Sequence, residues 1–116
     1  MGFINPRVST RPMYEEQLPI ALQKRMGIVA MKVYGGSSPG ELIGTGAGRA
    51  SARQLLRYAL SQTITVAIPA VSSLAELEEN LQVARDFSPM PAWERETLIA
   101  RIHEPQSKFA SLKDSP

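Results

Sequence analysis

The segment GTGAGRAS, residues 44–51, has the composition of a phosphate-binding loop. Glycines let a backbone approach a phosphate closely, and arginine can contact an anion through two parallel hydrogen bonds. The spacing differs from the known fingerprints, which read Gly-x-Gly-x-x-Gly directly after a strand or end in Gly-Lys-Ser/Thr. Here Arg49 stands where the third glycine would be, and no lysine follows Gly48. We therefore expect a connector or lid, from which Arg49 could still reach a phosphate.

A second stretch, IPAVSSLAELEEN at residues 68–80, is less conspicuous and more informative about nucleotides. Ser73 and Glu76 have the spacing of a capping box, and leucines then recur at helical intervals. The free N–H groups and the dipole at a helix N-terminus favour an anion. Ser72 and Ser73 are therefore candidates for contacts with a phosphate.

The remaining side chains that could take part in catalysis or bind a metal form no recognisable motif. The chain contains no cysteine, which excludes disulfides, zinc–thiolate sites and cysteine nucleophiles. The lone His103 falls near the end of a predicted helix, where the helix dipole favours it as a surface residue. Trp93 is expected to be a packing anchor and Tyr58 to pack within a helix.

Hydrophobic periodicity predicts the elements that position these residues. Short apolar runs predict buried strands at residues 28–34 and 63–68. Helical spacing predicts helices over residues 14–26, 51–62, 72–87 and 91–104, the first with Pro19 in its first turn and the second with a capping box from Ser51 and Gln54. Residues 1–13 are expected to be an irregular lead-in, residues 35–48 a long mobile loop with six of the eight glycines, and residues 106–116 a loose tail. The alternation of strands and helices predicts an α/β fold with a parallel sheet, although two strands alone do not form an independent sheet.

The composition limits the classes of protein to which the chain can belong. The 116 residues fit a single domain, and 43% hydrophobic residues are typical of globular chains. The net charge of +2 arises from interspersed charges of both signs, which argues against a nucleic-acid-binding face. No apolar run reaches the roughly 20 residues of a membrane span, and the first residues lack the apolar core of a signal peptide. We expect a cytoplasmic chain without membrane or nucleic-acid partners.

Four motifs together resemble the carboxyl-terminal part of the aldo/keto reductase family. They are Met31-Lys32 in the first predicted strand, LLRYALS at the end of a helix, Ile68-Pro69 at the end of the second strand, and Glu79-Asn80 in the following helix. The likeness extends over residues 14–98 and is greatest to the bacterial branch of the family. It implies a (β/α)8 barrel that reduces carbonyls with a nicotinamide cofactor. This chain would then be one incomplete barrel domain, holding the last two strands with their helices.

The resemblance also implies residues that bind the cofactor. The loop after the seventh strand lies along the cofactor pyrophosphate in the family, which corresponds here to Lys32, Val33 and Tyr34. The loop after the eighth strand and the start of its helix contact the phosphates of the adenosine end, which corresponds to the segment from Ala70 to Glu76. The implied cofactor-binding residues are therefore Lys32, Val33, Tyr34, Val71, Ser72, Ser73, Glu76, Glu79 and Asn80, with Glu79 and Asn80 at the adenine.

Two departures from the family pattern bear on the cofactor and on catalysis. Where NADP-dependent members carry basic residues, this chain has Ala70 and Glu76, so that NAD is favoured over NADP. The capping box offers a purely structural role for Glu76. The tyrosine, lysine, aspartate and histidine that the family uses for chemistry come from earlier strands, which this chain lacks, so we expect no catalytic residue within it.

Two hypotheses remain. The chain is either the cofactor-binding part of an aldo/keto reductase-like oxidoreductase, or a truncated remnant that neither catalyses nor binds a cofactor. The first hypothesis predicts a complementing chain that supplies the missing units. The second predicts self-association, because exposed strand edges pair with copies of themselves.

Overall fold

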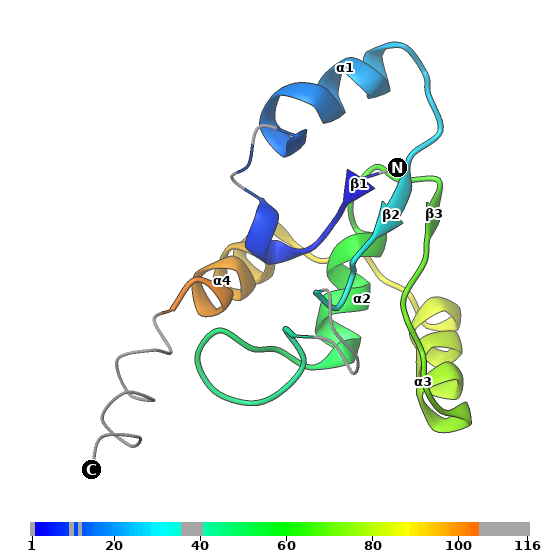
Figure 1. Cartoon of the computed structure of the whole chain (residues 1–116), viewed down its shortest axis with the longest axis vertical. Helices are drawn as coiled ribbons and strands as arrows, with labels where there is room; N and C mark the ends of the chain where they lie inside the picture. The colour runs from blue at the N-terminus through cyan, green and yellow to red at the C-terminus, as the bar shows by residue number, and fades with distance from the viewer. Residues whose placement is uncertain (1, 10, 12, 36–40, 105–116) are drawn as a thin grey trace.

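The computed structural model describes residues 2–9, 11, 13–35 and 41–104. They form a small α/β domain with four α-helices and a parallel sheet (Figure 1). In chain order the elements are β1 (Gly2–Phe3), a 3-10 turn η1 (Pro6–Val8), a π-helical segment η2 (Met13–Gln17), α1 (Leu18–Gln23), β2 (Val29–Met31), α2 (Ala52–Leu60), β3 (Val66–Ala67), α3 (Leu74–Arg85) and α4 (Ala92–Ile102).

The sheet has the order β1-β2-β3, and all neighbouring strands are parallel. β2 and β3 lie within the two segments that the sequence predicts as strands. β1 is a difference, because it falls in the segment that was expected to be irregular. The cause is burial: Ile4 is fully buried beside β2, and the fully enclosed Asn5 donates a hydrogen bond from Nδ2 to the carbonyl of Lys32 at 2.8 Å.

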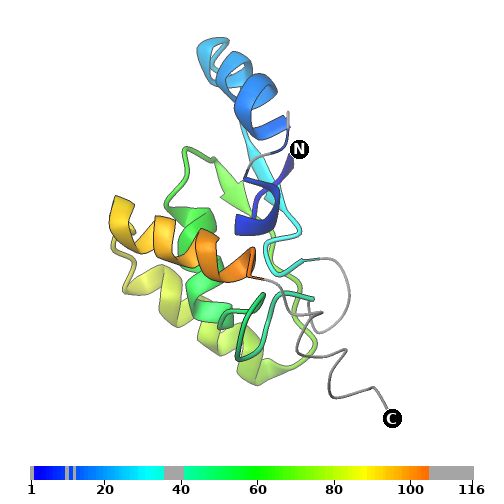
Figure 2. The same cartoon turned by 90° about the vertical axis from the view of Figure 1, so that its left-hand side faces the viewer.

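All three longer helices lie on the same side of the sheet. In Figure 1, α2 and α4 lie behind the strands, and the view turned by 90° in Figure 2 shows α2, α3 and α4 together on one side. No helix of the described residues covers the other side of the strands. The described part of the chain is therefore an open sheet with helices on one face, and it contains no barrel.

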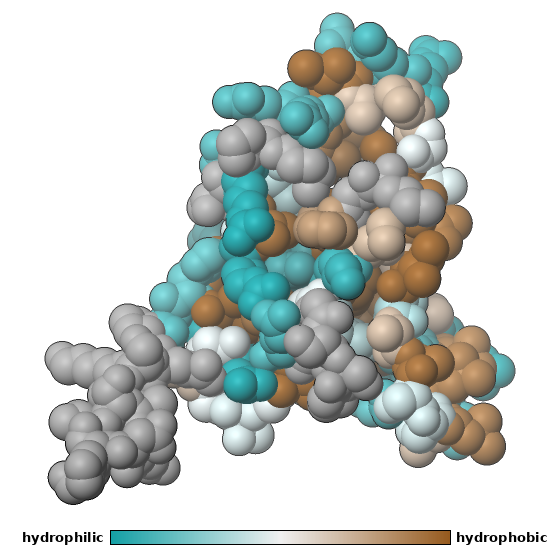
Figure 3. All heavy atoms as spheres, viewed as in Figure 1, coloured by the Kyte–Doolittle hydropathy of each residue, from teal (hydrophilic) through white to brown (hydrophobic). Residues whose placement is uncertain are grey.

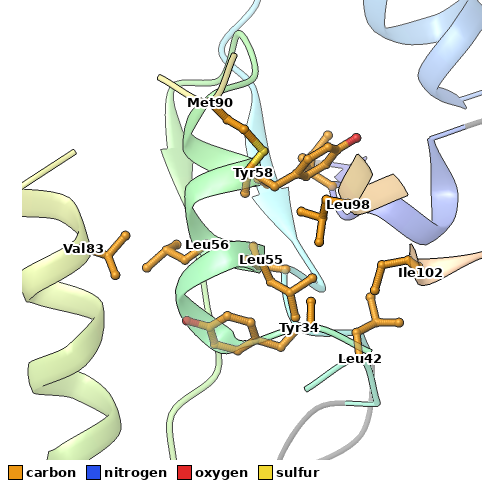
Figure 4. Close-up of a cluster of buried hydrophobic side chains, with 14 residues drawn as sticks. Tyr34, Leu42, Leu55, Leu56, Tyr58, Val83, Met90, Leu98 and Ile102 are labelled. Carbon is orange, nitrogen blue, oxygen red and sulfur yellow. The ribbon is translucent and has the colours of Figure 1, made fainter. Parts of the chain in front are cut away.

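Helix α2 forms the centre of the core, as its sequence pattern predicts. Ser51 and Gln54 make the expected capping box at its N-terminus. Its inward side chains are enclosed by residues from the sheet, from α3 and from α4, and Figure 4 shows Val83 of α3 pointing toward Leu56. Tyr58 is only 1% exposed, which confirms its predicted packing role.

The expected packing role of Trp93 is wrong. Trp93 is 69% exposed, because α4 turns Leu98 and Ile102 toward the core and leaves its first turn in solvent. The leucines that recur at helical spacing in α3, Leu74, Leu77 and Leu81, are exposed as well, and Val83 is the buried residue of this helix. Helical periodicity identifies an apolar face, but it cannot tell whether another element covers that face.

Helix α1 is shorter than the predicted helix over residues 14–26. Pro19 lies in its first turn, as expected, and the π-helical segment η2 precedes it. The chain leaves the helix through Arg25, which has a positive φ of 58°. The tail predicted at residues 106–116 lies outside the described residues.

The glycine-rich loop is held by bonds within the protein. The N–H of Gly44 donates to the carbonyl of Ala50 at 2.9 Å, and the N–H of Gly48 donates to the carbonyl of Arg101 at 2.8 Å. The guanidinium of Arg49 donates to the carbonyls of Glu41 and Ile43. Arg49 thus binds the loop to itself, so the described part is held rather than mobile as expected, and residues 36–40 of the predicted loop lie outside the described residues.

Candidate functional site

A cavity of about 170 Å3 lies between the segment after β2 and the N-terminal half of α3. Its walls come from four separate parts of the chain, and they consist of Tyr34, Ile43, Ala52, Glu76, Glu79 and Asn80. Four of these six residues are among the nine that the sequence assigns to a cofactor. The positions 76, 79 and 80 share one face of α3 because they are three or four residues apart.

A hydrogen bond joins the two sides of the cavity. The hydroxyl of Tyr34 donates to Oδ1 of Asn80 at 2.5 Å. Figure 4 shows the Tyr34 ring beneath α2, with its hydroxyl directed toward α3. The other amide atom of Asn80, Nδ2, is buried and has no hydrogen-bond partner. A buried donor without an acceptor costs about 1–3 kcal/mol of folding free energy. A ligand that offers a hydrogen-bond acceptor to Nδ2 would remove this cost.

Glu76 occupies the rim of the cavity and the start of α3. Its carboxylate accepts hydrogen bonds from the hydroxyl of Ser72 at 2.8 Å, from the N–H of Ser72 at 3.3 Å and from the hydroxyl of Ser73 at 3.2 Å. The N–H of Glu76 donates in turn to Oγ of Ser73, which is half of the predicted capping box. These bonds, above all those from Ser72, hold the pKa of Glu76 below its usual value of 4.5.

The cavity has a negative character. Two of the six lining residues are carboxylic acids, and none of the six is basic. Burial, together with the charges of Glu79 and Glu76, raises the pKa of Tyr34 to about 12. Tyr34 therefore remains protonated at neutral pH and acts as a hydrogen-bond donor.

The structure does not bring the other predicted residues into the cavity. The side chain of Val33 is 1% exposed and belongs to the core, whereas Lys32 is exposed and has a positive φ of 53°. Val71 is 45% exposed in the segment before α3, and neighbouring Ala70 is exposed too. Ser72 and Ser73 lie at the start of α3 as predicted, but their hydroxyl groups already bind Glu76.

Two lining residues were not predicted from the sequence. Ile43 comes from the glycine-rich loop and Ala52 from the first turn of α2. Both are ordinary apolar residues, and no sequence pattern marks them. The bridge between Ile43 and Ala50 closes the loop and holds Ile43 close to the start of α2, where Ala52 lies.

Catalytic chemistry finds no support among the described residues. All three tyrosines have pKa values above the ordinary value of 10, chiefly because of burial, and the hydroxyl of Tyr14 also lies 3.3 Å from that of Tyr58. A tyrosine that donates a proton near neutral pH needs the opposite shift. Within residues 2–35 and 41–104, as far as they are described, no three acidic, histidine or cysteine side chains gather as a metal site would require.

Comparison with known proteins leaves the family open. No model of a known protein family matches the chain. Searches of curated proteins and of solved structures likewise find no match. In the described part of the chain, no helix has the length and apolar character needed to cross a membrane.

Proposed function

We propose that the chain binds the adenosine end of a nicotinamide dinucleotide and does not transfer hydride by itself. The observation that carries this proposal is the cavity between Tyr34 and α3. Tyr34 follows β2, whereas Glu76, Glu79 and Asn80 lie on α3, yet all four line one cavity. The side-chain amide of Asn80 also contains a buried donor without a hydrogen-bond partner. The resemblance to aldo/keto reductases assigns the same four positions to the cofactor.

The size of the cavity agrees with a single ring. An apolar cavity of about 150 Å3 holds a benzene-sized molecule, whereas pockets for drug-sized ligands measure about 300–1,000 Å3. The volume of about 170 Å3 is therefore suited to a base, and the remainder of a dinucleotide would lie along the surface. An adenine ring offers nitrogen acceptors to Nδ2 of Asn80 and an amino group to the carboxylate of Glu79.

The charges favour NAD over NADP. A 2′-phosphate on the ribose would approach the carboxylate of Glu76, which no lining residue neutralises. The N-terminus of α3, which could otherwise attract a phosphate, is already used by that carboxylate.

Hydride transfer would require strands and a proton donor that the described residues do not supply. Three neighbouring parallel strands in sequence order, with α2, α3 and α4 on one face, are compatible with an arc of a (β/α)8 barrel that includes β1 in addition to the two expected strands. Such a barrel needs about 250 residues. A complementing chain would have to supply the remaining strands and the proton donor.

Calorimetric titration of the chain with NADH and NADPH tests the proposal. We expect saturable binding of NADH, weaker binding of NADPH, and a loss of about tenfold in NADH affinity on Asn80→Ala, which corresponds to one hydrogen bond of about 1.4 kcal/mol. Gln82→Ala is the matched control, because Gln82 lies on the same helix but is exposed and bonds only to Asp86 in the described contacts. Glu76→Gln should reduce the preference for NADH.

The alternative function, a remnant that binds no cofactor, is favoured by one observation. The carboxylate of Glu76 satisfies the start of α3 without any ligand. If a chain that is folded by circular dichroism binds neither dinucleotide at millimolar concentration, the cofactor proposal is overturned and this alternative remains.

A further inference from the structure

A polar side chain lies in the core just after β1. Asn5 is 1% exposed, and it is as buried as the apolar residues around it. Phe3, two residues earlier, is 48% exposed, and Figure 3 shows further apolar atoms at the surface over the strands. Burial of a polar group is costly unless its hydrogen bonds are satisfied. The hydrogen bonds that Asn5 makes must therefore account for its place in the core.

The side-chain amide of Asn5 joins two segments that follow neighbouring strands. Its Oδ1 accepts hydrogen bonds from the N–H of Arg7 at 3.0 Å and from the N–H of Val8 at 3.3 Å, which caps η1. Its Nδ2 donates to the carbonyl oxygen of Lys32 at 2.8 Å. Because β1 and β2 are parallel, both segments lie at the carboxyl ends of their strands. This is the end of a parallel sheet at which ligand sites form.

The carbonyl of Lys32 that Asn5 binds also closes a turn. It accepts a second hydrogen bond, from the N–H of Gly35 at 3.0 Å, so Val33 and Tyr34 are the two central residues of a four-residue turn. The side chain of Val33 is fixed in the core, whereas the ring of Tyr34 extends beneath α2 toward α3 (Figure 4). Asn5 therefore holds the first residue of the turn that presents Tyr34.

The backbone of Lys32 has a conformation that needs such support. Its φ of 53° lies in the left-handed region, which residues with a Cβ seldom occupy. A residue in a sparsely populated conformation persists only where its surroundings hold it, and such residues gather at ligand sites. The hydrogen bond from Asn5 is one restraint on Lys32, and the turn bond from Gly35 is a second.

We propose that Asn5 is a positioning residue of the dinucleotide site. Asn5 holds the carbonyl of Lys32, and the turn that begins there sets the Tyr34 ring. The hydroxyl of Tyr34 then meets Oδ1 of Asn80 at 2.5 Å in the wall of the cavity. Asn5 is not one of the six lining residues, so it acts on the cavity through Tyr34. The inference rests on the proposed function, in which Asn80 contacts the adenine.

Nuclear magnetic resonance of the side-chain amide of Asn80 tests this role. Asn5→Ser keeps an oxygen that can cap η1, because serine is a preferred N-cap residue, but it removes the donor to Lys32. We expect the Nδ2 proton signals of Asn80 to move toward the positions that they have in Tyr34→Phe, which lacks the hydroxyl. NADH affinity should fall about tenfold, as is expected for Asn80→Ala.

Ser61→Ala is the matched control. Oγ of Ser61 also bridges two segments, since it accepts from the N–H of Met90 at 2.8 Å and donates to the carbonyl of Arg57 at 2.7 Å. Ser61 follows the last turn of α2, at the opposite end of this helix from the cavity. Its replacement should lower the stability but leave the Asn80 signals and the NADH affinity unchanged. A purely structural role of Asn5 predicts the same behaviour for Asn5→Ser.

A second variant covers the case in which Asn5→Ser does not fold. Glycine adopts a positive φ freely, so Lys32→Gly should restore stability to the double variant Asn5→Ser/Lys32→Gly, which is compared with Lys32→Gly alone. Asn80 signals that stay in place when the Asn5 donor is removed, in either background, overturn the proposal whether or not NADH binds. Displaced signals in a chain that binds no NADH overturn the proposed function, while the link from Asn5 to the cavity wall stands.

Discussion

At the scale of single residues, Glu76 combines a structural role with an electrostatic one. Its carboxylate accepts bonds from Ser72 and Ser73 and lies at the positive end of the α3 dipole. It also lines the cavity, where the 2′-phosphate of an NADP molecule would approach it. The same charge that supports the helix therefore restricts which anions can approach.

The lowered pKa of Glu76 predicts a pH dependence of stability. Because the pKa is lower in the folded chain than its usual value of 4.5, the stabilisation is present above that pH and is lost as the pH falls through the folded value. We expect Glu76→Gln to lower the melting temperature at pH 7, and the difference from the wild type to shrink below about pH 4.5. Thermal melts at several pH values measure this difference. A constant difference down to pH 3 would contradict the proposed role of the charge.

The hydroxyl of Tyr34 should contribute more to stability than that of Tyr14. Tyr34→Phe removes the 2.5 Å bond to Asn80 and leaves both polar atoms of that amide without a partner. We expect a loss of about 1–3 kcal/mol in the free energy of unfolding, measured in urea. Tyr14→Phe serves as the comparison, since its bond to Tyr58 is longer, at 3.3 Å, and a smaller loss is expected.

At the scale of elements, the sequence predicts those that depend on local patterns. The capping box of α2, the helical spacing in α2, α3 and α4, and the apolar runs around β2 and β3 all lead to the observed elements. β1 was missed, because two residues carry no periodicity and the strand depends on distant contacts of Ile4 and Asn5. For the same reason, the sequence could place Tyr34 and Asn80 in a common site only through the family resemblance, and it gave no indication of Ile43 or Ala52.

Two glycines on either side of β2 should differ in how well they tolerate replacement by alanine. Gly35 has a φ of +106°, and a Cβ there would lie 3.0 Å from the backbone nitrogen of Glu41. Gly35→Ala should therefore cost about 1–3 kcal/mol of unfolding free energy through backbone strain. At Gly27, a Cβ would lie 3.6 Å from Oγ1 of Thr65, in ordinary contact, and Gly27→Ala should cost much less. Equal losses in urea unfolding would show that the turn relaxes easily.

At the scale of the whole molecule, one contact joins η1, near the start of the described chain, to α4, near its end. The contact between η1 and α4 has a consequence for synthesis on the ribosome. His103 Nε2 lies 3.2 Å from the carbonyl oxygen of Pro6, across 97 positions of sequence. η1 is translated before α4, so this anchoring contact forms only after α4 has left the exit tunnel. Until then Ile4 and Val8, both buried in the native chain, lack part of their cover. In the nascent chain, η1 is therefore secured only once α4 has been made.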